Sequence, residues 1–180
     1  MGKQLPALNS ALTGFIQAQK MFFVATAGHE TSINLSPKGL DTFHIIDERS
    51  VMWLNLTGSG NETAAHVLEN PRMTIMFCGM EEKPLILRLY GKARAIYETD
   101  EEWDDRIKLF NHTMGARQIF HLDVEIVQTS CGFGVPYYDY KGQRELLDKW
   151  SSNKKDGELK DYWKKKNMVS IDGKPTGIKF

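Results

Sequence analysis

The segment Thr57–Thr63 (TGSGNET) is the part of this sequence best suited to binding an anion. Its two glycines, Gly58 and Gly60, carry no Cβ, so the neighbouring backbone N–H groups can turn toward a ligand. A helix expected to begin within the segment would add unpaired N–H groups and the positive end of its dipole. Polar side chains are supplied by Ser59, Asn61, Glu62 and Thr63. The segment therefore predicts a site for a phosphate-sized anion.

A simpler interpretation of the same segment is a turn followed by a capped helix. Asn61 is a favourable N-cap residue, and glycines are common in turns. The segment is not a P-loop, because the Gly-Lys-Ser/Thr ending is missing. The carboxylate of Glu62 would repel a phosphate, so an anion site also needs a cation from elsewhere in the chain.

Two basic residues are candidates for that cation. Lys38 follows Ser36-Pro37 in the loop SPKG, which could equally be a turn with a solvated lysine. Arg88 interrupts the apolar segment LILRLYG. Strand alternation places Arg88 opposite the leucines, on the face away from the core, where a ligand or a second subunit would cover it.

Other reactive groups give weaker signals. Cys131 lies beside glycines in SCGFGVP, where a structural cysteine is commoner than a reactive thiol. No nucleophile-elbow motif supports hydrolase chemistry. The histidines show no metal-ligand spacing, and no metal site is expected; they are His29, His44, His66, His112 and His121.

The elements that must position these residues are short strands with few helices among them. Apolar β-forming runs predict strands at 21–27, 31–35, 42–46, 51–56, 73–80, 85–97 and 120–127. Helices are predicted at 5–19, 63–69, 100–110, 143–152 and 158–166. Six or seven strands without regular crossover helices favour a mainly β, antiparallel barrel with peripheral helices (α+β) over a doubly wound sheet. The composition shifts after SCGFGVP, which predicts a barrel domain at 1–140 and a helical appendage at 141–180 packed on it.

Composition excludes several classes of function. Lys plus Arg and Asp plus Glu both number 23, so the balanced charge favours neither nucleic acid nor anionic membrane as a partner. The basic helix KDYWKKKN is interpreted as a solvated helix that docks Tyr162 and Trp163. No apolar run approaches the ~18 residues of a membrane span. Two cysteines and no signal-peptide pattern predict a cytoplasmic protein without disulfides.

Five segments in order resemble the flavin-binding split-barrel family of pyridoxamine 5'-phosphate oxidase. They are FFVATA, INLSPKG, MWLNLTGSGNET, LENPRMTIMF and LRLYGKARAIY, within residues 15–136. The resemblance is closest to an uncharacterised subgroup that carries SPKG, GSGNET and SCGFGVP. It implies a split barrel of six or seven antiparallel strands that binds FMN at the interface of a homodimer.

The resemblance, together with the anion segment and the two cations described above, indicates which residues would contact the flavin. They are Asn34, Ser36, Lys38, Leu56, Thr57, Ser59, Gly60, Asn61, Glu62, Thr63 and Arg88. Asn61–Thr63 fall where the oxidases carry Ser-Arg-Lys for the phosphate, so both expected cations are replaced. Either Lys38 and Arg88 substitute for them, or backbone N–H groups hold the phosphate, or FMN binds weakly. The substrate-binding Arg-x-His of the oxidase is not found, which argues against oxidation of vitamin B6 itself.

The function implied is an FMN-dependent oxidoreductase of unknown substrate, with the flavin carrying hydride or electrons. One alternative is a non-catalytic module that binds or senses flavin. Another is the same barrel with a different cofactor, either haem, which the lack of well-placed histidines disfavours, or a deazaflavin, which the missing phosphate cations leave open.

Overall fold

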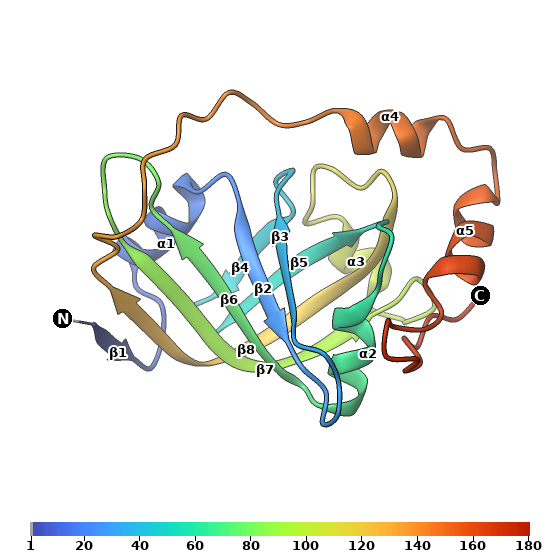
Figure 1. The fold of residues 1–180 in the computed structure, drawn as a ribbon, viewed down its shortest axis with the longest axis horizontal. Coiled ribbons are helices and arrows are strands. Elements are labelled where there is room, and N and C mark those ends of the chain that lie inside the picture. The colour runs from blue at the N-terminus through green and yellow to red at the C-terminus, as the bar shows by residue number, and fades with distance from the viewer. Residues whose placement is uncertain (1) are drawn as a thin grey trace.

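A curled antiparallel half-barrel forms the body of the protein in the computed structural model, which describes residues 2–180 (Figure 1). Its strands are β1 (Lys3–Leu5), β2 (Phe22–Thr26), β3 (Asn34–Lys38), β4 (Phe43–Asp47), β5 (Ser50–Leu56), β6 (Arg72–Cys78), β7 (Ile86–Ile96) and β8 (Ala116–Ser130). The helices are α1 (Ser10–Ala18), α2 (Glu62–Glu69), α3 (Trp103–Ile107), α4 (Leu146–Ser152) and α5 (Glu158–Lys166). The predicted fold class is confirmed.

The strands follow the order β3-β2-β6-β7-β8-β5-β4, and β1 pairs with β8 outside this path. Every pairing is antiparallel. The eight strands exceed the predicted six or seven because β1, only three residues long, gives no periodic signal. β3 and β4 are both edge strands, so the barrel is split between them.

Side chains alternate between the two faces of each strand, and those on the inner face of the curled sheet form the main hydrophobic core. Leu87 and Leu89 of β7 are fully buried, and Leu89 lies between Ile75 of β6 and Val127 of β8. The helix α1 adds Phe15 to this inner cluster. A smaller cluster lies on the outside of the sheet under α3, formed by Met52, Leu54, Ile96, Phe110 and Ile119.

Two β-bulges interrupt the long strands. At the first, the register between β7 and β8 shifts at Gly91, whose added Cβ would lie 1.9 Å from the carbonyl oxygen of Asp123. At the second, Asn55 pairs with Gln118 but Leu56 pairs with Ala116, which leaves Arg117 as the extra residue. A bulge redirects the side chain of the residue it leaves unpaired.

Several predicted boundaries were wrong. The first three residues of the loop expected at SPKG belong to β3, and Pro37 is tolerated there because β3 pairs on one side only. The first helix begins at Ser10, because the Asn9 side chain accepts a hydrogen bond from the Leu12 N–H at 3.0 Å. Asp100 does not cap a helix; its carboxylate accepts from the Tyr97 N–H at 2.8 Å.

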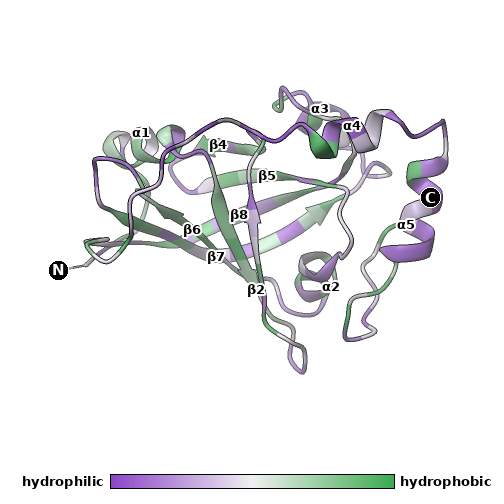
Figure 2. Cartoon of the chain, turned by 45° about the horizontal axis from the view of Figure 1, so that its top comes forward, coloured by the Kyte–Doolittle hydropathy of each residue, from purple (hydrophilic) through white to green (hydrophobic). Residues whose placement is uncertain are grey.

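After β8 the chain crosses the open side of the half-barrel as an extended segment and then forms α4 and α5 (Figure 1). Figure 2 shows hydrophilic residues along much of α5, whereas the strands are largely hydrophobic. The one buried side chain of α5 is Trp163, as its expected docking requires. Within residues 2–180, no helix is long and apolar enough to cross a membrane.

Candidate functional site

Near the split of the barrel, side chains link β3 to β5, two strands that do not pair with each other. Lys38 pairs with the buried Phe22, so its side chain points into the curl, as do those of Asn34 and Ser36. Lys38 Nζ lies 3.5 Å from Oδ1 of Asn55, at the end of β5. The Oγ of Ser36, from the same face of β3, is buried and has no hydrogen-bond partner in residues 2–180.

A second contact joins the start of β3 to the first turn of α2. The side-chain amide of Asn34 donates to Oγ1 of Thr63 at 3.1 Å. Together with the Lys38–Asn55 contact, it brings residues 34–38 alongside the segment 55–63. The sequence-based anion site requires this proximity of Lys38 to the TGSGNET segment.

Arg117, which the sequence analysis did not identify, is a second buried cation at this junction. Its Nη2 donates to the carbonyl oxygen of Gly60 at 3.0 Å, while Nε and Nη1 are buried without a partner in residues 2–180. Burial lowers the pKa of Arg117 to about 10, although the nearby Tyr162, Tyr97 and Glu62 oppose this shift. The bulge in β8 directs this side chain toward the turn, and the sequence GARQIF gave no signal of that bulge.

The two cations act on each other. Burial first, and the charge of Arg117 second, lower the pKa of Lys38 from 10.5 to about 8. Among the described residues no carboxylate lies within salt-bridge distance of either side chain. Two desolvated positive charges without a direct ion pair make this junction electrostatically suited to an anion.

The TGSGNET turn is fixed from outside by the C-terminal segment. The indole N–H of Trp163 donates to Oγ1 of Thr57 at 2.9 Å. The side-chain amide of Asn167 donates to the carbonyl oxygens of Gly58 at 3.1 Å and Ser59 at 3.4 Å. The Asn167 bonds occupy two carbonyl groups of the turn, while the Thr57 N–H donates to the carbonyl oxygen of Gly115 at 2.7 Å and the N–H groups of residues 58–61 donate no hydrogen bond within residues 2–180.

Asn61 does not cap α2, contrary to the simpler interpretation of the sequence. Its Oδ1 accepts from Gln118 at 2.6 Å, and its Nδ2 donates to the carbonyl oxygen of Asn167 at 3.4 Å. Within residues 2–180, the backbone N–H groups of residues 62–64 donate no hydrogen bond. The start of α2 therefore retains donors that an anion would satisfy.

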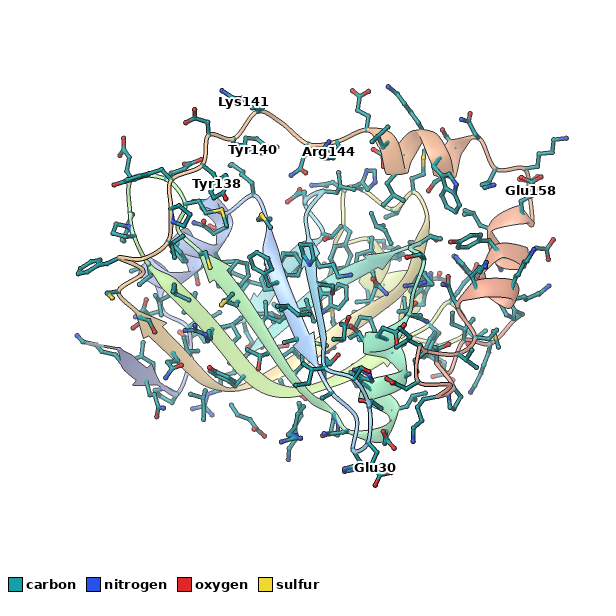
Figure 3. All side chains as sticks on the ribbon, in the orientation of Figure 1. Glu30, Tyr138, Tyr140, Lys141, Arg144 and Glu158 are labelled. Carbon is teal, nitrogen blue, oxygen red and sulfur yellow. The ribbon has the colours of Figure 1, made fainter. Side chains whose placement is uncertain are left out.

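A cavity of about 510 Å³ is lined in part by Lys38. Pro37, Lys38 and Gly39 line one wall, and Tyr140 and Arg144 of the extended segment line the other. Figure 3 shows these two residues on the segment that crosses above the half-barrel. The volume falls in the range of ~300–1,000 Å³ typical of small-molecule sites.

The remaining predicted residues take different positions. Ser59 and Gly60 are exposed, and Leu56 is partly buried under α3. Arg88 lies on the outer face of the sheet, where its Nη1 donates to Oγ of Ser130 at 3.3 Å. Within one chain it therefore faces away from Lys38, and its role at the flavin stays a prediction that requires a second chain.

The split antiparallel half-barrel with peripheral helices defines the class of the protein, and comparisons with known proteins supply its family. A family model described as pyridoxamine 5'-phosphate oxidase matches residues 8–131. The chain belongs to this family.

Individual relatives agree with this assignment. The pyridoxamine 5'-phosphate oxidase family protein ustO of Aspergillus flavus is 34% identical over 189 residues, covering 94% of this chain and 75% of that protein. HupZ of Group A Streptococcus superposes with a TM-score of 0.53 at 19% identity, over 66% of this chain and 91% of that one. A FAD-binding protein of Mesorhizobium loti gives a TM-score of 0.50 at 11% identity, over 72% and 97% of the two chains. The two structures show the shared fold alone.

Proposed function

We propose that the protein binds FMN and acts as a flavin-dependent oxidoreductase, with the phosphate of FMN held between Lys38, Arg117 and the start of α2. The observation that carries this proposal is the pair formed by the buried Arg117 and the largely desolvated Lys38, neither of which has a carboxylate within salt-bridge distance in residues 2–180. The bound phosphate would stabilise both charges and accept from the unengaged N–H groups of α2.

The donors around the junction fit a flavin better than a metal complex or haem. Buried atoms without partners in residues 2–180 include the indole N–H of Trp53 and the guanidinium N–H groups of Arg117. These donors suit the oxygens of a phosphate and a ribityl chain. When bound, the flavin would supply hydride or electron transfer, and the protein would orient its ring.

An exposed row of side chains on the outer face of the sheet supports the proposal of a homodimer. One row across five strands consists of Leu35, Ala25, Thr74, Tyr90 and Ile126, in register. Leu35 is 63% exposed and Ile126 is 40% exposed. Arg88 lies in the next row, so a second chain packed here would cover Arg88 as the sequence analysis expects.

The dimer is tested by size measurement at low micromolar concentration. Leu35→Asp is expected to give monomers, because it places a charge on the most exposed apolar side chain of the row. Phe133→Asp, at a side chain that is 82% exposed on another segment, is the matched control and should leave the dimer intact. A monomeric wild-type protein would contradict the proposal.

The cofactor is tested by titrating FMN and riboflavin into Lys38→Met, Arg117→Met and the control Lys83→Met. Each site variant is expected to weaken FMN at least tenfold and riboflavin little, because only FMN carries the phosphate. Equal losses for both flavins, or no FMN binding by wild type at high micromolar concentration, would reject the site. Flavin bound without reduction by NADH or NADPH and without turnover would identify a binding module in place of an enzyme.

A further inference from the structure

Three side chains from two segments distant in sequence converge at α2, and the proposed phosphate site uses the backbone N–H of one of these residues, Glu62, but none of their side chains. Glu62 and His66 are one turn apart on α2, and Asp172 comes from the C-terminal segment. Their ligand atoms, two carboxylate oxygens and one ring nitrogen, all lie within 4.8 Å of one another. Asp172 is presented by a tight turn that the antiparallel bridge between Val169 and Pro175 closes.

The imidazole of His66 is the most informative member of this cluster. The residue is 1% exposed, and its Nδ1 lies 3.1 Å from Oγ1 of Thr26. Its Nε2 is buried and has no hydrogen-bond partner in residues 2–180. A ring nitrogen in this situation is unfavourable unless something binds it. Metal-binding histidines commonly have the other ring nitrogen fixed by a hydrogen bond, as Thr26 fixes Nδ1 here.

Both carboxylates are held in position by other groups. Oε2 of Glu62 accepts from the Ile171 N–H at 2.9 Å. The two oxygens of Asp172 accept from the N–H and the hydroxyl of Ser32, each at 3.0 Å. Each carboxylate oxygen has two lone pairs, so these bonds leave capacity for a metal ion. Such outer bonds are the orienting interactions that metal-ligating carboxylates show.

We propose that Glu62, His66 and Asp172 bind one divalent transition-metal ion of the zinc type, which ties the turn 169–175 to α2. One imidazole nitrogen with two carboxylate oxygens is a donor set that Zn²⁺ accepts, and three protein ligands leave a position for water. The sequence analysis expected no metal site, because histidine spacing alone does not reveal a ligand contributed by the C-terminal segment. The metal proposal uses the side chain of Glu62 and the flavin proposal its backbone N–H, so either proposal can fail without the other.

The test is a calorimetric titration of Zn²⁺ into the full chain after treatment with a chelator and without flavin. Wild type is expected to bind one ion per chain. His66→Gln and Asp172→Asn are each expected to weaken Zn²⁺ binding at least tenfold, because each removes one of three ligands. The matched controls His29→Gln and Asp161→Asn change exposed residues of the same types and should bind as wild type does.

Asp172→Asn decides the outcome, since His66 is buried and its substitution can disturb folding. Asp172 lies at the surface end of the cluster, and asparagine still accepts from Ser32. Circular dichroism establishes that each variant is folded. Wild type without saturable Zn²⁺ binding, or folded Asp172→Asn with wild-type affinity, would overturn the proposal and leave the cluster as a hydrogen-bond network alone.

Discussion

The ammonium group of Lys38 lies over the indole of Trp53, with Nζ 5.1 Å from the ring centroid. The face of an aromatic ring attracts a cation, most strongly when water is excluded. This contact and the 3.5 Å approach to Asn55 are the polar interactions that the ammonium group of Lys38 makes within residues 2–180. They do not replace its lost hydration, and burial lowers its pKa to about 8.

The first prediction concerns the pH dependence of FMN binding under the proposed function. Lys38 is protonated below pH 8 and loses its charge above it. The dissociation constant of FMN should therefore rise above pH 8, by up to ~10-fold per pH unit, because binding then requires uptake of one proton. Fluorescence titrations between pH 7 and 9.5 measure this slope. Riboflavin should show no such slope, and a slope that persists in Lys38→Met would assign it to another group.

The second prediction concerns stability without ligand. The pKa of Lys38 is lowered on folding, so its charged form disfavours the folded state at neutral pH. Lys38→Met should raise the free energy of unfolding at pH 7 by about 1–2 kcal/mol. In wild type, the unfolded chain binds more protons than the folded chain does between pH 8 and 10.5. The free energy of unfolding lost through the burial of charged Lys38 is therefore regained across that window as the pH rises. Urea denaturation of wild type, Lys38→Met and the exposed control Lys83→Met measures both effects; a less stable Lys38→Met would contradict the assigned burial cost.

The third prediction concerns the hydrogen bonds from Trp163 and Asn167 that hold the TGSGNET turn, here called the clamp. Asn167 is fully buried, and its amide donates to the carbonyl oxygens of Gly58 and Ser59. Asn167→Ala leaves these acceptors without their partner and should lower the free energy of unfolding by about 1–3 kcal/mol. Asn153→Ala, at an exposed position, should change stability little. Equal effects of the two substitutions in urea denaturation would mean that the clamp contributes nothing.

The fourth prediction concerns the bulge between β7 and β8. A Cβ at Gly91 would lie 1.9 Å from the Asp123 carbonyl oxygen, so Gly91→Ala must separate two strands. We expect a loss of roughly 2–4 kcal/mol, measured as a lower thermal midpoint. Gly134→Ala is the control, because no atom lies within 4 Å of its added Cβ. A wild-type midpoint for Gly91→Ala would show that the bulge can move.

Local patterns predicted elements wherever side chains alternate or repeat. The leucines of β7 placed Arg88 on the outer face correctly, because Leu87 and Leu89 are buried. The helix at 158–166 was predicted with its observed bounds. Prediction failed where a neighbouring strand decides the structure. Pro37 continues β3 because one side of that strand is unpaired, a property of sheet order that the local sequence does not carry.

The candidate site was only partly predictable for the same reason. Lys38 and the TGSGNET segment stood out by residue type, and the structure brings them close together. Arg117 and Asn55 did not stand out, because a β-bulge and the pairing of β5 with β8 determine where their side chains lie. Asn167 and Trp163 reach the turn from the far end of the chain, and no spacing rule connects such positions.

The clamp also has a consequence for biosynthesis. Strands β1 to β8 lie within the first 130 residues, so the ribosome releases the whole sheet before Trp163 and Asn167 leave the exit tunnel. Domains fold from the N-terminus during synthesis. The nascent sheet can therefore assemble with its glycine turn still loose, and the turn acquires its final shape only after Trp163 and Asn167 have left the exit tunnel.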